Sequence, residues 1–204
     1  MNVFISGTDT NVGKTIISSW LALHMGFAYF KPIQTGTEES RDSETVVALS
    51  GAKIYPESFS YRKPISPHLA ANIENDNIDL NQIVVPQDTD LIVEGIGGVL
   101  VPLNSDVFVI DLIRKLEMPV LLVACTRLGT INHTLLSLEV LRSRNIEVLG
   151  VIMNGKPDFE NKKAIESYGN TTVVAEFPIM SEICYNSLKC FKLPDKLNRL
   201  LTGK

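Results

Sequence analysis

A loop near the amino terminus ends in a Gly-Lys-Thr triplet and could bind phosphate. The loop, GTDTNVGKT, runs from Gly7 to Thr15 between an apolar run and an amphipathic stretch. Backbone N–H groups of a glycine-rich turn and of the helix N-terminus after it attract anions. In such a loop the lysine, here Lys14, reaches the β- and γ-phosphates of a nucleotide, and the hydroxyl of Thr15 ligates Mg²⁺. An ordinary strand-to-helix turn is the alternative, but strand, loop and helix follow in the order that a nucleotide site requires.

Three further ionisable residues could organise a metal ion and an anionic reacting group. Glu94 closes an apolar run, Asp42 lies near the start of an expected helix, and Lys31 follows another apolar run. Each has an ordinary explanation, as a strand-terminal acid, a helix N-terminal acid and a solvated lysine. Together with Thr15 they describe two or three oxygen ligands for Mg²⁺ and a cation for an anionic group.

Composition and charge are those of an ordinary globular chain. Apolar residues make up 45% and charged residues 21% of the 204 residues, and the net charge is −4. This charge provides no basic field for nucleic acid, and the longest apolar run, Val120 to Cys125, is too short to span a membrane. Three cysteines without CxxC spacing and three scattered histidines indicate neither a disulfide framework nor a zinc site. We therefore expect a cytoplasmic protein that binds neither nucleic acid nor membranes.

Short apolar runs alternate with helical patterns along the chain. The runs occupy residues 2–6, 27–32, 88–95, 119–125, 147–155 and 171–178. Near-continuous Val, Ile and Leu runs are typical of strands buried on both faces, and hence of a parallel sheet. We predict one α/β domain over residues 1–204, a P-loop NTPase-like fold with a mostly parallel sheet and helices on both faces. Residues 54–87 have an irregular, proline-containing pattern, which predicts a surface excursion over one edge of the sheet.

Ligands of such sheets bind outside the carboxyl ends of the strands. The candidate segments are therefore those that follow the apolar runs, namely residues 7–15, 31–36, 94–98 and 126–132, and Asn154.

The segments GTDTNVGKT, FKPIQTG, SPH, VEGIGG, LGTINH and IMNG occur in this order. This set closely resembles the dethiobiotin synthetase family, and the resemblance runs from Val3 to about Pro178. The common phosphate-loop motif has a glycine where this chain has Thr8, with Gly7 one residue earlier, and this longer spacing is itself the pattern of the family.

The resemblance implies an ATP- and Mg²⁺-dependent cyclo-ligase. Its substrates would be 7,8-diaminononanoate, CO₂ and ATP, and its products dethiobiotin, ADP and phosphate. One amine of the substrate captures CO₂ as a carbamate, the γ-phosphate of ATP activates the carbamate as a carbamic-phosphoric anhydride, and the second amine closes the ring. The protein would contribute positioning and charge neutralisation.

The resemblance also implies roles for individual residues. Lys14 and Lys31 are the expected catalytic residues, with Lys31 stabilising the carbamate and the transferring phosphoryl charge. Mg²⁺ would be organised by Thr15, Asp42 and Glu94. ATP would be bound by Thr10, Asn11, Val12, Gly13, Lys14 and Thr15, with Asn154 at the adenine and Glu182 at the ribose. The diamine would be contacted by Thr35, Pro67, Ile96, Gly97, Gly98 and Asn132.

Asn132 carries a further implication about assembly. In the family, the segment that corresponds to LGTINH holds the tail carboxylate of the substrate and comes from the partner subunit. The resemblance therefore implies a homodimer with shared active sites.

Rival functions are less well supported. A ParA/MinD-like switch ATPase has an extra lysine inside the loop, but Thr8 to Val12 contains none. The segment KLPDKLNRLL, residues 192–201, faintly resembles a basic membrane helix, although Leu197, Leu200 and Leu201 could equally pack a terminal helix onto the domain. An amide synthase of cobalamin assembly would need a further glutamine-hydrolysing domain. A GTPase would need a guanine-reading motif that NGKPD, residues 154–158, does not match.

Overall fold

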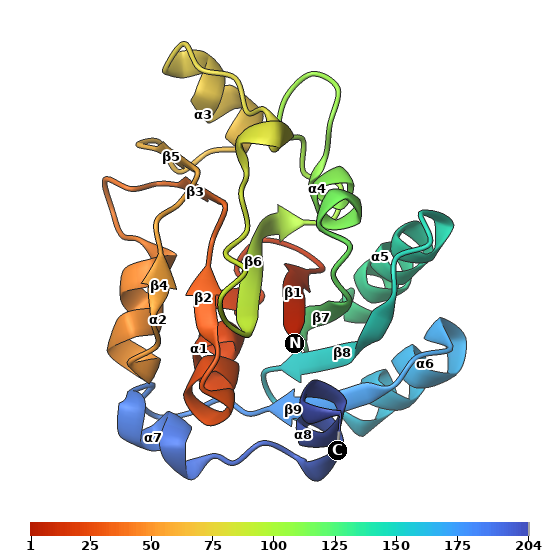
Figure 1. Cartoon of the computed structure of the whole chain (residues 1–204). Coiled ribbons are helices and arrows are strands. Elements are labelled where there is room, and N and C mark those ends of the chain that lie inside the picture. Colours follow the sequence, from red (N-terminus) through yellow and green to blue (C-terminus); the bar gives the residue numbers. More distant parts are fainter. Residues whose placement is uncertain (204) are drawn as a thin grey trace.

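The computed structural model describes residues 1–203, and its centre is a seven-stranded sheet (Figure 1). The strand order is β4-β2-β6-β1-β7-β8-β9, and adjacent strands pair in parallel. The strands are β1 (Asn2–Gly7), β2 (Ala28–Phe30), β4 (Ile54–Tyr55), β6 (Leu91–Gly98), β7 (Val120–Cys125), β8 (Val148–Asn154) and β9 (Val173–Phe177). Each predicted apolar run overlaps one of these strands.

Helices cover both faces of this sheet. One face packs against α1 (Lys14–Met25), α2 (Asp42–Ser50), α7 (Tyr185–Cys190) and α8 (Asp195–Thr202), and the other against α4 (Val109–Leu116), α5 (Thr130–Ser143) and α6 (Phe159–Gly169). Alternate residues of a strand point to opposite faces. Accordingly, Leu121 of β7 lies in the core beneath α1, and Leu122 lies in the core beneath α5. The predicted fold class is confirmed.

The topology brings three candidate segments to one edge of the sheet. Strand β1 is central, between β6 and β7. The chain leaves β1 through the phosphate loop and α1, crosses over β6 to form β2, and later returns to form β6 between them. The loop after β1, Lys31 after β2 and Glu94 in β6 therefore meet near the carboxyl ends of adjacent strands, where ligands of α/β sheets bind.

The predicted irregular excursion is only partly correct. Its edge position is right, because β4 is an outer strand of the sheet. However, residues 54–87 also contain β5 (Phe59–Tyr61), α3 (Pro67–Ile73) and the 3₁₀ turn η1 (Leu80–Gln82), and β5 pairs with β3 (Ile33–Thr35). Phe59 and Tyr61 are buried. Strands of two or three residues are too short to show a periodic pattern, so the sequence did not predict them.

The carboxyl-terminal segment docks against α1. The ring of Trp20 stacks on Phe191 and meets Phe177 edge-on, with both centroids 5.2 Å away. The indole N–H of Trp20 donates to the carbonyl of Phe191 at 2.6 Å. Leu197 and Leu201 of α8 are buried in the same core, while Leu200 is partly buried against it. Of the two interpretations of this segment, packing onto the domain is the correct one, and within residues 1–203 no helix is long and apolar enough to cross a membrane.

This packing predicts that Leu197→Ala lowers the free energy of unfolding by about 2–5 kcal/mol, since a fully buried leucine is replaced by a cavity. Urea unfolding, followed by the fluorescence of Trp20, measures the change. Val84, whose side chain is 77% exposed, gives the matched control, because Val84→Ala should change stability by less than about 0.5 kcal/mol. Equal losses in the two variants would contradict the docking of α8.

Candidate active site

The phosphate loop presents free backbone groups at the start of α1. Gly13 has a φ of 96°, in the left-handed region, and a Cβ there would lie 2.0 Å from Nδ2 of Asn154. Only glycine fits both requirements. The amide of Asn154 donates to the carbonyl of Val12 at 2.8 Å and holds the loop in place. Among the described residues, no side chain caps the N-terminus of α1, so its first N–H groups are available to an anion.

Lys14 lies folded into this loop. Its side chain is nearly buried, and its ammonium donates to the carbonyl of Asp9 at 3.0 Å. Burial lowers the pKa of Lys14 to about 8, although the nearby charge of Glu94 opposes this shift. A desolvated ammonium next to free N–H groups is a site at which a phosphate anion is stabilised.

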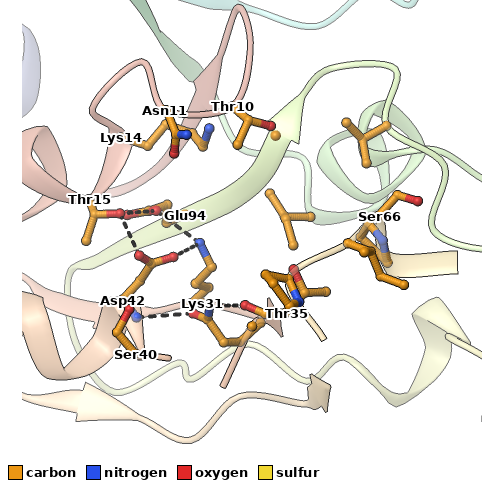
Figure 2. Close-up of a pocket in the computed structure, with 18 of the residues that line it drawn as sticks. Thr10, Asn11, Lys14, Thr15, Lys31, Thr35, Ser40, Asp42, Ser66 and Glu94 are labelled. Carbon is orange, nitrogen blue, oxygen red and sulfur yellow. Dashed lines mark hydrogen bonds and ion pairs between the residues drawn. The ribbon is translucent and has the colours of Figure 1, made fainter. Parts of the chain in front are cut away.

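Two carboxylates, a hydroxyl and an ammonium converge beside the loop, as Figure 2 shows. The Thr15 hydroxyl lies 3.0 Å from Oδ1 of Asp42 and 3.0 Å from Oε1 of Glu94. The ammonium of Lys31 forms an ion pair with Oδ2 of Asp42 and donates to Oε1 of Glu94 at 3.1 Å. Lys31 is only 3% exposed, so the simple interpretation of this residue as a solvated surface lysine is wrong.

The charges in this cluster stabilise one another. Burial alone lowers the pKa of Lys31, but the charges of Glu94 and Asp42 outweigh burial and hold this pKa above its ordinary value. Burial likewise raises the pKa of Asp42, but the ammonium of Lys31 outweighs it and holds this pKa below its ordinary value. Lys31 and Asp42 are therefore charged at neutral pH.

The oxygen atoms of this cluster fit a magnesium ion. Mg²⁺ prefers oxygen ligands and is usually held by one or two carboxylates together with water and substrate phosphates. The hydroxyl of Thr15 lies within hydrogen-bond distance of both carboxylates, those of Asp42 and Glu94. Within residues 1–203 there is no group of three or more His, Cys, Asp or Glu that could hold a metal.

A cavity of about 530 Å³ joins the phosphate loop to the β3–α3 region. This volume is typical of a small-molecule site. Of the residues predicted from the sequence, the cavity is lined by Thr10, Asn11, Gly13, Lys14, Thr15, Lys31, Thr35, Asp42, Pro67, Glu94, Ile96 and Gly97. The structure thus brings together residues from five separate segments of the sequence.

Five predicted residues lie outside the lining of this cavity. Val12 is fully buried behind the loop, and Asn154 supports the loop as described above. Gly98 lines an adjacent, mostly apolar cavity of about 430 Å³ next to α5. Asn132, in the first turn of α5, and Glu182, in the segment between β9 and α7, are exposed.

Three residues that position the site were not predicted. The hydroxyls of Ser18 and Tyr29 donate to Oε2 of Glu94 at 2.8 and 3.1 Å. The side chain of Gln34 accepts from the backbone N–H of Asp42 at 3.2 Å and so fixes the start of α2. Only Ser18 had a local signal, since it lies one helical turn after Thr15 and thus on the same face of α1.

Comparison with known proteins identifies close relatives. A family model described as an AAA domain matches residues 1–184. The ATP-dependent dethiobiotin synthetase BioD of Lawsonia intracellularis is 50% identical over 200 residues, which cover 98% of each chain. The protein of the same name from Paramagnetospirillum magneticum is 49% identical over 85% of this chain and 86% of its own.

Solved structures share the fold at much lower identity. A ParA family ATPase from Chlorobium tepidum has a TM-score of 0.59 and 11% identity over 98% of this chain and 96% of its own. Chloroplast FtsY from Physcomitrella patens has a TM-score of 0.53 and 16% identity over 98% of this chain and 64% of its own. These two similarities concern the P-loop NTPase fold alone. The two dethiobiotin synthetases are decisive, because they are 50% and 49% identical to this chain over 98% and 85% of its length. The chain belongs to the family of ATP-dependent dethiobiotin synthetases.

Proposed function

We propose that this protein uses ATP to carboxylate 7,8-diaminononanoate with CO₂ and to close the ureido ring of dethiobiotin, releasing ADP and phosphate. The observation that carries the proposal is the position of Lys31, whose buried ammonium lies at the junction of the phosphate loop and the cavity. A fixed charge there is suited to a small anion that receives a phosphoryl group. The names of the close relatives support the same substrate class.

The phosphate loop is proposed to hold the ATP triphosphate. The free N–H groups at the start of α1 and the ammonium of Lys14 would contact its oxygens, with Thr10, Asn11, Val12 and Gly13 contributing backbone groups. Thr15, Asp42 and Glu94 would hold Mg²⁺, which when bound neutralises phosphate charge and orients the γ-phosphate. Asn154 and Glu182 are the proposed contacts to adenine and ribose.

The diamine is proposed to occupy the other end of the cavity, where Thr35, Pro67, Ile96 and Gly97 lie, with Gly98 at its margin. One amine attacks CO₂, forming a C–N bond and losing a proton, and gives a carbamate. Lys31 compensates its negative charge and keeps the carbamate oxygen directed at the γ-phosphate.

Ring closure then needs no further group from the protein. The carbamate oxygen attacks the γ-phosphorus and the bond to ADP breaks, which leaves a carbamic-phosphoric anhydride. The second amine attacks the carbonyl carbon, the ureido ring forms, and phosphate departs with the electron pair of the C–O bond. Both nucleophiles belong to the substrate, so the protein supplies position and charge. In this respect the site differs from one built around a catalytic Ser or Cys.

A homodimer with shared sites is part of the proposal. Asn132 is exposed and lies outside the cavity of its own chain. This position is consistent with a contact to the substrate in the site of a partner subunit. Leu100, Leu128 and Leu136 are also exposed, and two of them border the apolar cavity beside α5. Neighbouring exposed apolar side chains, such as Leu100 and Leu136, are typical of a protein interface. The three cysteines form no disulfide in the structure, which suits the cytoplasmic location that we propose.

The primary test is the formation of dethiobiotin from purified protein, 7,8-diaminononanoate, bicarbonate, Mg²⁺ and ATP, detected by mass spectrometry with phosphate followed in parallel. Product should form only when all components are present. Lys14→Ala and Lys31→Met should each lower turnover at least about 100-fold, because each removes a charge that stabilises the reacting groups. Lys53→Met, which changes an exposed lysine, should leave turnover unchanged. Phosphate release without dethiobiotin would instead favour a switch ATPase of the ParA type.

Shared active sites predict complementation between two inactive variants. Lys31→Met and Asn132→Asp should each inactivate both sites of a homodimer. A mixed dimer, isolated with two different affinity tags, contains one site with both residues intact, so it should have about half of the wild-type activity per dimer. Mixed dimers as inactive as the two parents would refute the sharing of sites, even if dethiobiotin synthesis itself were established.

A further inference from the structure

The carboxylate of Glu94 has two oxygens with different surroundings. Its side chain is fully buried. Oε1 lies 3.0 Å from the hydroxyl of Thr15 and 3.1 Å from the ammonium of Lys31, both of which line the cavity. Oε2 accepts from the hydroxyls of Ser18 at 2.8 Å and Tyr29 at 3.1 Å. Oε1 therefore contacts residues of the site, and Oε2 contacts residues of the protein interior.

Ser18 and Tyr29 approach Oε2 from two different elements. Ser18 is on α1 and Tyr29 on β2, and both side chains are fully buried. A carboxylate oxygen has two lone pairs, so these two hydroxyls satisfy Oε2 from the interior, whereas the two neighbours of Oε1, Thr15 and Lys31, line the cavity. The phenol of Tyr29 and the hydroxyl of Ser18 each have one proton to donate, and both donate it to Oε2.

We propose that Ser18 and Tyr29 are positioning residues, which fix the Glu94 carboxylate so that it offers Oε1 alone to Mg²⁺. This inference rests on the proposed function, in which Glu94 organises the metal.

The terminal torsion of glutamate explains why such support matters. This torsion has a broad, two-fold distribution, so an unsupported carboxylate turns easily and exchanges its oxygens. Donors from two elements, α1 and β2, both hold Oε2 and so oppose this rotation. Hydrogen bonds to a ligating carboxylate typically change metal affinity by 10- to 100-fold when they are removed.

A merely structural role is the competing explanation, because the same hydroxyls also join α1 to β2. The two roles differ in what they affect. Positioning of Glu94 alters the dependence on Mg²⁺, whereas a general loosening of α1 against the sheet alters the phosphate loop and hence the binding of nucleotide even without metal.

The experiment measures ADP binding by isothermal titration calorimetry, in EDTA and across a series of Mg²⁺ concentrations. For Tyr29→Phe and Ser18→Ala, ADP affinity in EDTA should stay within about twofold of the wild type. In the wild type, Mg²⁺ should increase the affinity for ADP. The Mg²⁺ concentration that gives half of this increase should rise about tenfold in each variant and further in the double variant.

Two matched controls separate this effect from the loss of any buried hydroxyl. Tyr61 is also buried and donates to a carboxylate, that of Asp76, at 2.8 Å, but it does not line the cavity. Ser50 is buried in α2 and donates to the carbonyl of Val46 at 2.6 Å. Tyr61→Phe and Ser50→Ala should leave the Mg²⁺ dependence unchanged.

Two results would overturn the inference. One is a dependence on Mg²⁺ that is unchanged in the Ser18 and Tyr29 variants. The other is a loss of ADP affinity in these variants that is as large in EDTA as it is in Mg²⁺. If the ADP affinity of the wild-type protein does not depend on Mg²⁺, Glu94 is not a metal ligand and this inference is wrong as well. The dethiobiotin assay judges the proposed reaction separately.

Discussion

The burial of the Glu94 carboxylate is the constraint on which the site depends. A charged group inside the protein is destabilising unless it is paired and hydrogen-bonded. The ammonium of Lys31 and the hydroxyls of Ser18 and Tyr29 donate to Glu94, and the hydroxyl of Thr15 lies 3.0 Å from its Oε1. These partners come from α1, from β2 and from the segment after it. The contacts that pack α1 on the central strands are thus the same contacts that compensate the buried charge of Glu94 and set the geometry of the site.

Parallel pairing supplies these partners at fixed positions. Tyr29 pairs with Ile92 and Phe30 with Val93, so continuation of the register places Lys31 beside Glu94. On the other side of β6, Ile5 of β1 pairs with Glu94, two residues before the phosphate loop begins. A slip of one residue in either pairing would turn Glu94 toward the opposite face of the sheet. The buried apolar residues on both faces prevent such a slip, so the hydrophobic pattern of the strands also determines the position of the charges.

The sequence predicted what local patterns encode, namely the central strands, the loop and the residues just after the strands. It did not predict the roles of Tyr29 and Gln34, because a tyrosine in an apolar run and a glutamine in a short strand have no local signal. Their partners, Glu94 and the backbone of Asp42, are near only in the folded chain. The paired strands β3 and β5 were missed because each has three residues. The sequence assigned Asn132 to the substrate only through a second subunit, and in the single chain this residue is exposed.

The two buried lysines of the site are shifted in opposite directions, and this difference fits a division of labour. Burial dominates at Lys14, whose bonded partner is the neutral carbonyl of Asp9, and its pKa falls to about 8. Carboxylates dominate at Lys31, and its pKa rises. Lys14 therefore lacks a full counter-charge and gains most from an arriving phosphate. Lys31 already has two counter-charges, so in the proposed reaction it would contribute a charge whose position is fixed before the substrates meet. A reaction whose nucleophiles both come from the substrate needs such a fixed charge more than it needs a reactive side chain.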